Sequence, residues 1–187
     1  MILLVVRILL LFIISGESSL EKNFLLNPST MKTNDKWRIV NDGVMGGLSS
    51  SKAVVNDDKI IFSGNVSLEN NGGFASLRSP VKDYNFSEFT GLEIKLKADG
   101  KRYSISMKET TYFNGYFYTA SFETKEDEWI TIKLPFDQFK LYYFGRRMNS
   151  DSEIPLDKIK EISFLIGDKQ AGEFKTEIDY IKLYYYK

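Results

Sequence analysis

Apolar and polar residues alternate strictly along the chain from Lys36 onward. In residues 91–98, Leu92, Ile94 and Leu96 alternate with charged residues, and residues 129–136 show the same period. Further runs of this kind lie at 59–69, 102–109, 115–123, 161–167 and 174–186. A period of two over five to eight residues is typical of a strand with one buried and one solvated face.

Turn-forming clusters separate these runs, at residues 56–59, 70–73, 98–101, 112–115 and 168–173. Their Gly, Asn and Asp residues tolerate the backbone conformations that tight turns require. The spacing predicts nine or ten strands and no amphipathic helix longer than two turns. The pattern therefore predicts an all-β sandwich built around one core.

Composition narrows the chemistry that such a sandwich can perform. At 187 residues and 43% apolar content, the chain is long enough to bury one sizeable core. Its 25 basic residues balance its 25 acidic residues, so no overall field favours nucleic acid as a partner. Cys and His are both absent, which excludes disulfides, thiol nucleophiles, Ser-His-Asp triads and the usual zinc sites.

The N-terminal residues differ from the rest of the chain in being almost entirely apolar. Residues 1–14 are apolar except for Arg7, and the small residues Gly16 and Ser18 follow. This resembles a secretory signal peptide over residues 1–18, so we expect a mature chain that begins near Ser19 and is periplasmic or secreted. The alternatives are an N-terminal membrane anchor, or a start codon placed too far upstream, which leaves the protein cytoplasmic.

Two further segments complete the expected domain organisation. Residues 19–34 form a polar lead-in, of which we expect only Phe24, Leu25 and Leu26 to pack. Residues 35–187 form the sandwich domain.

Several motifs in fixed order extend the interpretation. WRIVNDGVMGGLSSS begins at Trp37, and FSGNVSLENNGGFASLRSP, KADGKRYSISM, WITIKLPFDQF and IKEISFLIGDKQAGEFKTEIDYIKLY follow. This series resembles the complex I intermediate-associated protein 30 family, which shows a D-x-V-M-G-G-x-S loop, a G-G-F-x-x-x-R strand and a W-x-x-x-x-L-P-F segment. The resemblance implies a jelly-roll sandwich of the galactose-binding-like type.

The same resemblance implies a function and a set of motif positions. It implies a role in assembling NADH:ubiquinone oxidoreductase, as a chaperone that binds a respiratory-complex intermediate. An exported chain would not meet the matrix-side arm of that enzyme. The motif positions that we expect to be structural are Trp37, Gly46, Gly47, Gly72, Gly73, Phe74 and Trp129.

The glycine-rich loop at residues 41–50 has two interpretations. In the structural one, Asn41, Asp42 and Gly43 form a turn, Gly46 and Gly47 let the backbone pass close under a neighbouring strand, and Met45 plugs the core. In the functional one, Asp42, Ser49 and the loop amides form a polar binding pocket. A phosphate loop is excluded, because no helix follows to receive a phosphate.

Arg78 ends the segment GGFASLR and shares a strand face with Phe74 and Ser76. A half-buried guanidinium must be paired, and we expect Asp42 to be its partner. The alternative is a solvated Arg at the edge of the sheet.

Aromatic residues gather at 111–122 and 139–148. We expect Phe117, Tyr118 and Phe122 to fill the core, and Trp129 to be covered. Tyr112, Tyr143 and Arg146 are the residues that we expect to be exposed for a partner or a sugar ring, since such side chains are enriched at binding surfaces.

Three classes of function stay open at this point. The first is a non-catalytic assembly module that acts through protein–protein contacts, and the second is a carbohydrate-binding module of the galactose-binding-like type. The third is a lyase or hydrolase using carboxylates, for which no suitably spaced pair is visible. We expect no cofactor. Related sandwiches often carry a structural calcium ion, but no loop of alternating acidic residues is present to hold one.

Overall fold

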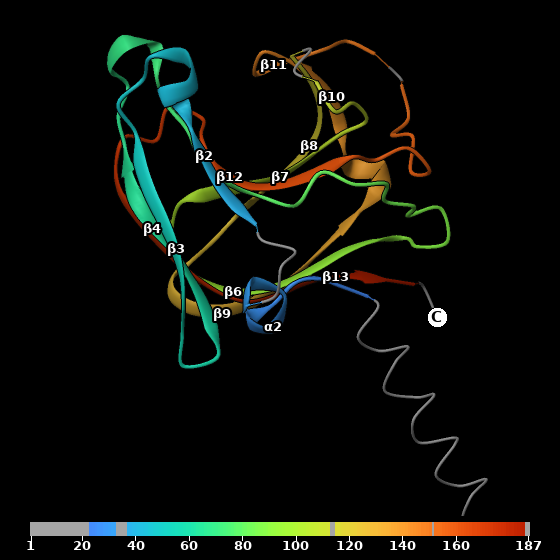
Figure 1. Ribbon diagram of the computed structural model, residues 1–187, viewed down its shortest axis with the longest axis horizontal. Helices are drawn as coiled ribbons and strands as arrows, with labels where there is room; N and C mark the ends of the chain where they lie inside the picture. The colour runs from blue at the N-terminus through green and yellow to red at the C-terminus, as the bar shows by residue number, and fades with distance from the viewer. Residues whose placement is uncertain (1–22, 33–36, 113–114, 151, 186–187) are drawn as a thin grey trace, which may run out of the picture.

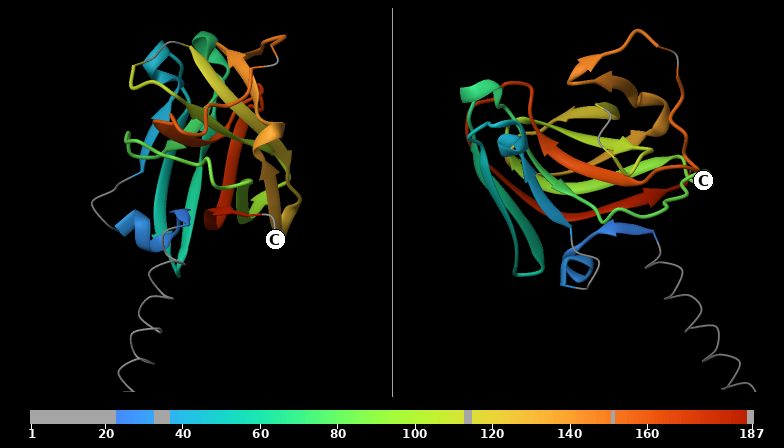
Figure 2. Two further views of the ribbon diagram at one scale, coloured as in Figure 1. Left: turned by 90° about the vertical axis from the view of Figure 1, so that its right-hand side faces the viewer. Right: turned by 45° about the horizontal axis from the view of Figure 1, so that its top comes forward.

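A computed structural model describes residues 23–32, 37–112, 115–150 and 152–185, and it confirms the jelly-roll β-sandwich. The predicted signal peptide, with its cleavage point after Ser18, lies outside the described residues. Two antiparallel sheets stack face to face (Figure 1; Figure 2). The apolar members of the alternating runs meet between them, as the sequence period requires.

The first sheet has six strands. Its order is β3 (Ser50–Asn56), β4 (Lys59–Val66), β13 (Gly172–Tyr184), β6 (Gly91–Asp99) and β9 (Glu126–Pro135). Strand β1 (Phe24–Leu26) also pairs with β13. The expectation that this part of the lead-in packs is confirmed, because Leu26 has no exposed surface.

The second sheet has seven strands. Its order is β11 (Arg146–Arg147), β10 (Lys140–Tyr143), β8 (Tyr116–Glu123), β7 (Arg102–Lys108), β12 (Glu161–Ile166), β5 (Ala75–Arg78) and β2 (Arg38–Asn41). The described residues hold 13 strands, more than expected, because strands as short as β1, β10 and β11 are too brief to show a period.

Helical structure in the described residues is confined to short pieces. Helix α2 spans Pro28–Lys32, and the 3-10 turns η1, η2 and η3 span Asp42–Met45, Glu69–Asn71 and Phe136–Gln138. Among the described residues, none of these helices has the length and apolarity needed to cross a membrane.

The core contains aromatic and branched side chains from both sheets. Phe62 of one sheet and Phe164 of the other meet edge to face, with ring centroids 6.0 Å apart, and Tyr103 stacks on Phe164 at 5.3 Å. The buried Tyr103 hydroxyl donates to Asp99 at 3.0 Å, so this hydroxyl is satisfied. Trp37 is also buried, with its indole N–H donating to the Leu25 carbonyl at 3.1 Å.

The seven-stranded sheet is strongly curved. Figure 1 shows the sheet bending upward at both sides, with β2 beside β3 at one side and with β10 and β11 rising away from the six-stranded sheet at the other. The outer face of the seven-stranded sheet is therefore concave, whereas the outer face of the other sheet is convex. This concave face is where the candidate functional side chains lie.

The expectation that Trp129 is covered was wrong. Alternation along β9 places it on the convex outer face, as predicted, but 40% of its surface is exposed. Strand β9 is an edge strand of its sheet. The ammonium groups of Lys59 and Lys95 lie 5.6 and 5.9 Å from the centroid of its ring.

Candidate functional site

Hydroxyl groups line the middle of the concave face. Along β7 and β8, the apolar residues point into the core, so Ser104, Ser106, Thr119 and Ser121 point outward. Ser104 is hydrogen-bonded to Ser121, and Ser106 to Thr119, each at 2.8 Å. Because these side chains are small and polar, the middle of the concave face stays open and can exchange hydrogen bonds with a ligand.

A hollow of about 510 Å³ opens where β7, β8 and β10 run side by side. Hydroxyls, an amide, one aromatic ring and three cations line it. The lining residues are Arg102, Thr119, Ala120, Ser121, Asp137, Gln138, Lys140, Tyr142 and Arg147. This set can bind polar or acidic groups.

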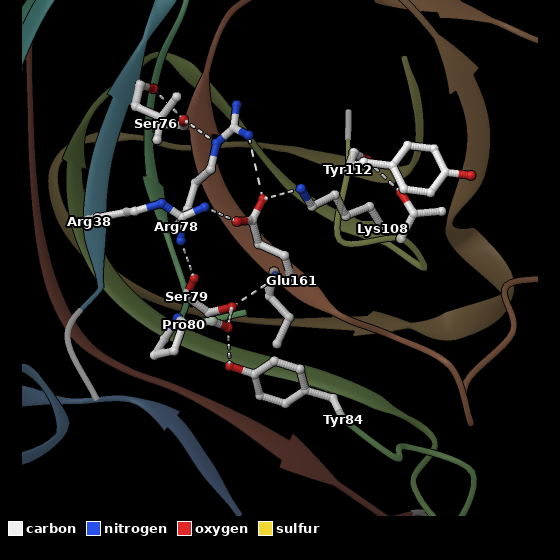
Figure 3. A network of polar contacts seen from close by, with 12 residues as sticks. Arg38, Ser76, Arg78, Ser79, Pro80, Tyr84, Lys108, Tyr112 and Glu161 are labelled. Atoms are coloured by element: carbon white, nitrogen blue, oxygen red, sulfur yellow. Dashed lines mark hydrogen bonds and ion pairs between the residues drawn. The ribbon is translucent and has the colours of Figure 1, made fainter. Parts of the chain in front are cut away.

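At the other end of the concave face, one buried carboxylate forms ion pairs with three cationic side chains (Figure 3). Glu161 on β12 has no exposed side-chain surface and is paired with Arg38, Arg78 and Lys108. Arg78 Nη1 lies 3.4 Å and Lys108 Nζ 3.3 Å from Oε1, while Arg38 Nη2 donates to Oε2. We call these four residues the Glu161 cluster. Three positive charges against one negative leave it with an excess of two.

The predicted pairing of Arg78 with Asp42 was wrong, although the guanidinium is paired, as expected. Asp42 meets the beginning of β5, whereas Arg78 ends that strand, about 13 Å further along at the usual rise per residue. On the concave face the Arg78 guanidinium reaches diagonally to Glu161, two residues from its register partner Ser163 on strand β12. Burial lowers the pKa of Arg78, with Glu161 opposing and Arg38 reinforcing that shift.

Asp42 is instead the hub of the glycine-rich loop. Its buried carboxylate accepts hydrogen bonds from the backbone N–H groups of Ser49 at 2.9 Å, Gly73 at 2.6 Å and Phe74 at 3.2 Å, and from the Ser49 hydroxyl. Burial raises the pKa of Asp42, but these donors outweigh it and the pKa falls below its usual value. The loop is thus tied to the start of β5 through one side chain.

The glycines let the chain approach that carboxylate. A Cβ at Gly47 would lie 2.5 Å from Asp42 Cγ, and one at Gly72 would lie 2.6 Å from Asp42 Oδ2. Gly46 has open space around it but a φ of +89°, so backbone conformation rather than close approach requires glycine there. Glycine thus has a structural reason at both positions of the loop, but the expected close passage under a neighbouring strand was wrong for Gly46, and at Gly47 the nearest atoms belong to the Asp42 side chain.

The same loop exposes apolar side chains. Met45 is 58% exposed, so the expectation that it plugs the core was wrong, and Val44 is 73% exposed. Leu48 and Leu68 adjoin Ser49 and Ser67, which are hydrogen-bonded to each other at 2.9 Å. We call Val44, Met45, Leu48 and Leu68 the rim patch. The name refers to the rim of the seven-stranded sheet, because η1, which contains Val44 and Met45, directly follows the edge strand β2. The loop that Asp42 holds closed therefore presents an unusually apolar tip.

The aromatic predictions are confirmed in most positions. Tyr118 and Phe122 are buried, Tyr112 is 69% exposed, and Tyr143 and Arg146 are exposed and opposite each other in the β10–β11 pair. Phe117 was expected in the core but is half-buried on the outer face, because it has the opposite parity to Tyr118. The candidate residues thus form no single site: Asp42 and Ser49 share one place, Tyr143 and Arg146 another, and Figure 3 shows Tyr112 beyond Lys108 from Glu161.

Sequence reasoning missed the Glu161 cluster. Alternation in residues 161–166 places Glu161 with Ser163 on the face opposite Ile162 and Phe164, which is a detectable signal. Nothing in the sequence shows that this face is concave enough to bury a carboxylate. In the described residues, no group of three or more acidic side chains is placed to hold a metal ion.

Comparison with known sequences identifies relatives over most of the chain. The family model of complex I intermediate-associated protein 30 matches residues 26–178. The mitochondrial protein of that name from Mus musculus is 26% identical over 171 residues, which cover 80% of this chain and 52% of the mouse protein. Its Drosophila melanogaster counterpart is 29% identical over 108 residues, covering 54% and 36%. The chain thus spans about half or less of the length of these relatives.

Comparison with solved structures supports the fold. A family 11 carbohydrate-binding module of a cellulosomal cellulase from Clostridium thermocellum superposes with a TM-score of 0.63. It is 20% identical, and the match covers 88% of this chain and 95% of the module. At this identity the likeness concerns the sandwich alone.

Proposed function

Because the chain belongs to the complex I intermediate-associated protein 30 family, we propose that it is a non-catalytic assembly module for NADH:ubiquinone oxidoreductase. It holds an assembly intermediate through protein–protein contacts. Family membership over residues 26–178 is the observation that carries this proposal. The absence of Cys and His from the whole sequence agrees with a role that needs no catalytic thiol or imidazole.

The rim patch is the surface that we assign to this contact. The fully buried centre of a protein interface is more apolar than the rest of the surface, and a rigid loop contributes to it without a large ordering cost. Val44 and Met45 also stand in the loop by which the chain resembles the family. Asp42 holds the loop in one conformation before the partner arrives, which lowers the entropy lost on binding.

The test uses cells that normally express the protein and assemble this enzyme. Deletion should deplete assembled NADH:ubiquinone oxidoreductase on native gels, and the wild-type chain should restore it. Replacing Val44 and Met45 by Ser should abolish restoration without reducing the amount of soluble protein. Val81→Ser is the matched control, because Val81 is also exposed but lies outside the patch.

Two results would contradict the proposal. Unchanged enzyme assembly after deletion would remove the assembly role. Full restoration by the Val44→Ser, Met45→Ser double variant would remove the rim patch as the contact surface.

A carbohydrate-binding module is the second candidate. The specific observation in its favour is the hollow beside Tyr142, in which an aromatic ring stands next to hydroxyls and the amide of Gln138. A glycan array probed with the purified chain tests it. Binding that is lost in Tyr142→Ala would support this candidate, and an array without signal would exclude the glycans displayed.

A further inference from the structure

Side chains from six neighbouring strands form one row across the concave face. The register pairs Lys140 with Thr119, Thr119 with Ser106, Ser106 with Ser163, Ser163 with Arg78, and Arg78 with Arg38. The row therefore has a cation at one end, hydroxyls in its middle and two cations at the other end. We call it the cross-strand row.

The charge at the Arg78 end is incompletely compensated. Arg78 Nε donates to Ser76 and Nη1 to Glu161, while Lys108 approaches only Glu161 among the described residues. Arg78 Nη2 and the remaining ammonium hydrogens of Lys108 thus keep donor capacity beside a buried carboxylate. The side chains of Arg78 and Lys108 are only 15% and 9% exposed. Poorly hydrated excess charge of this kind favours an incoming anion.

The opposite end of the row is also cationic. Lys140 lines the hollow together with Arg102 and Arg147. Of these, Arg102 is paired with Glu123 and Asp168 at 3.6 and 3.7 Å, whereas Lys140 Nζ donates to the Asp137 carbonyl at 2.8 Å. Asp137 is the one carboxylate in the lining of this hollow. Both ends of the row are therefore suited to acidic groups.

We propose that the cross-strand row binds an extended segment of the partner protein that carries acidic residues at both ends. The proposal rests on the proposed function, and it names the chemistry of the partner. Five inter-strand spacings of about 4.8 Å give a row about 24 Å long, which an extended peptide of about seven residues spans. The hydroxyls between the ends exchange hydrogen bonds with its backbone.

The row favours a peptide over a sugar chain. None of its six side chains is aromatic, and Tyr142, the ring on which the carbohydrate candidate rests, lies beside the Lys140 end alone. The hydroxyls in the middle of the row can instead hydrogen-bond to a peptide backbone, while the cations at its two ends pair with acidic side chains of that peptide.

The test measures binding of a labelled heptapeptide, Glu-Glu-Ser-Gly-Ser-Glu-Glu with blocked ends, to the full chain by fluorescence anisotropy. A peptide with Gln in place of every Glu, an oligogalacturonate and a neutral cello-oligosaccharide are the comparison probes. We expect the acidic peptide to bind and the Gln peptide to fail, and we expect binding to weaken as salt is added.

Charge variants of the chain locate the site. Lys140→Gln should weaken acidic-peptide binding about tenfold, the worth of one charge-assisted hydrogen bond. Lys125→Gln, the matched control outside the row, should leave affinity within about twofold. Glu161→Gln should tighten binding, because it removes the negative charge that competes with the ligand. Where Glu161→Gln does not fold, the two lysine variants decide.

Three outcomes would overturn the inference: no binding of the acidic peptide, equal binding of the Gln peptide, or equal effects of the two lysine variants. Binding of oligogalacturonate without the peptide would assign the row to an acidic sugar and overturn the peptide assignment. None of these results depends on the rim-patch test in cells, so failure of this inference and failure of the assembly role are distinguishable.

Discussion

Replacing Asp42 with Ala should destabilise the fold more than a substitution in a loop usually does. The change removes the acceptor of three backbone N–H groups, those of Ser49, Gly73 and Phe74. Leaving a buried donor without a partner costs about 1–3 kcal/mol, and water entering from the rim holds each near the lower end. The expected loss is therefore about 3–5 kcal/mol, a large share of the ~5–15 kcal/mol that stabilises a domain.

Urea unfolding followed by tryptophan fluorescence measures this loss, since Trp37 is buried in the folded chain. Asp42→Asn should fall between wild type and Asp42→Ala, because one amide oxygen still accepts. Asp83→Ala is the control, since this carboxylate is exposed and its ion pair in the described part of the chain is with Lys160. A loss below about 1 kcal/mol for Asp42→Ala would refute the assignment of Asp42 as the hub of the loop.

The double variant of Asp42→Ala with Arg78→Ala tests whether the two networks are separate. Arg78 belongs to the Glu161 cluster, and its hydrogen bonds in the described residues are to Ser76 and Glu161 and not to Asp42. The two losses should add within about 0.5 kcal/mol. A combined loss well short of the sum would show that the two side chains are coupled after all.

Four further predictions follow from the structure and the sequence. The lowered pKa of Asp42 means that its stabilisation is complete above pH ~4 and is lost as pH falls through the folded-state pKa, so Asp42→Asn should flatten the acid limb of a stability–pH curve. Gly47→Ala should cost about 1–3 kcal/mol by forcing its Cβ onto Asp42, whereas Gly43→Ala, with open space around it, should be near neutral in the same unfolding assay. Burial and the hydrogen bond to Glu93 raise the pKa of Tyr180 to about 12, so stability should fall between pH ~10 and ~12, and less so in Tyr180→Phe. N-terminal sequencing should find a mature chain that begins near Ser19, which would place the assembly contact away from the matrix-side arm of NADH:ubiquinone oxidoreductase, whereas recovery of Met1 from a cytosolic fraction would contradict export.

The corrected exposure of Trp129 changes the expected cost of truncating it. A covered Trp would cost about 3 kcal/mol or more on truncation to Ala. Because 40% of this side chain is exposed, with two lysines flanking the ring, the loss should be nearer 1–2 kcal/mol. Trp37→Ala, at a buried position, should show the larger value.

Local pattern was sufficient for the elements of the fold. Alternation assigned Leu92, Ile94 and Leu96 to the core side of β6, and all three are fully buried. The family motifs then supplied the jelly-roll arrangement, which periodicity alone leaves open. A side-chain period of two depends only on neighbouring residues, so it is readable from the sequence.

The functional surfaces required the tertiary structure. The motifs indicated that Asp42 and Arg78 matter, and the sequence placed both in distinctive segments. Their partners could not be predicted, because a partner depends on which strands are adjacent and in which register. The register places Ser163 of β12 opposite Arg78 of β5, and it leaves Asp42 at the other end of β5.

The curvature of the seven-stranded sheet decided where the outward-facing charged side chains gather. It buries Glu161 on a face that the sequence marks only as outward, and it collects cations from β2, β5 and β7 around that carboxylate. The sequence by itself determined which residues point in and which point out. Only the tertiary structure decided that one outward face is hollow, because twist and strand order set the shape of a sheet and neither is encoded in a local period.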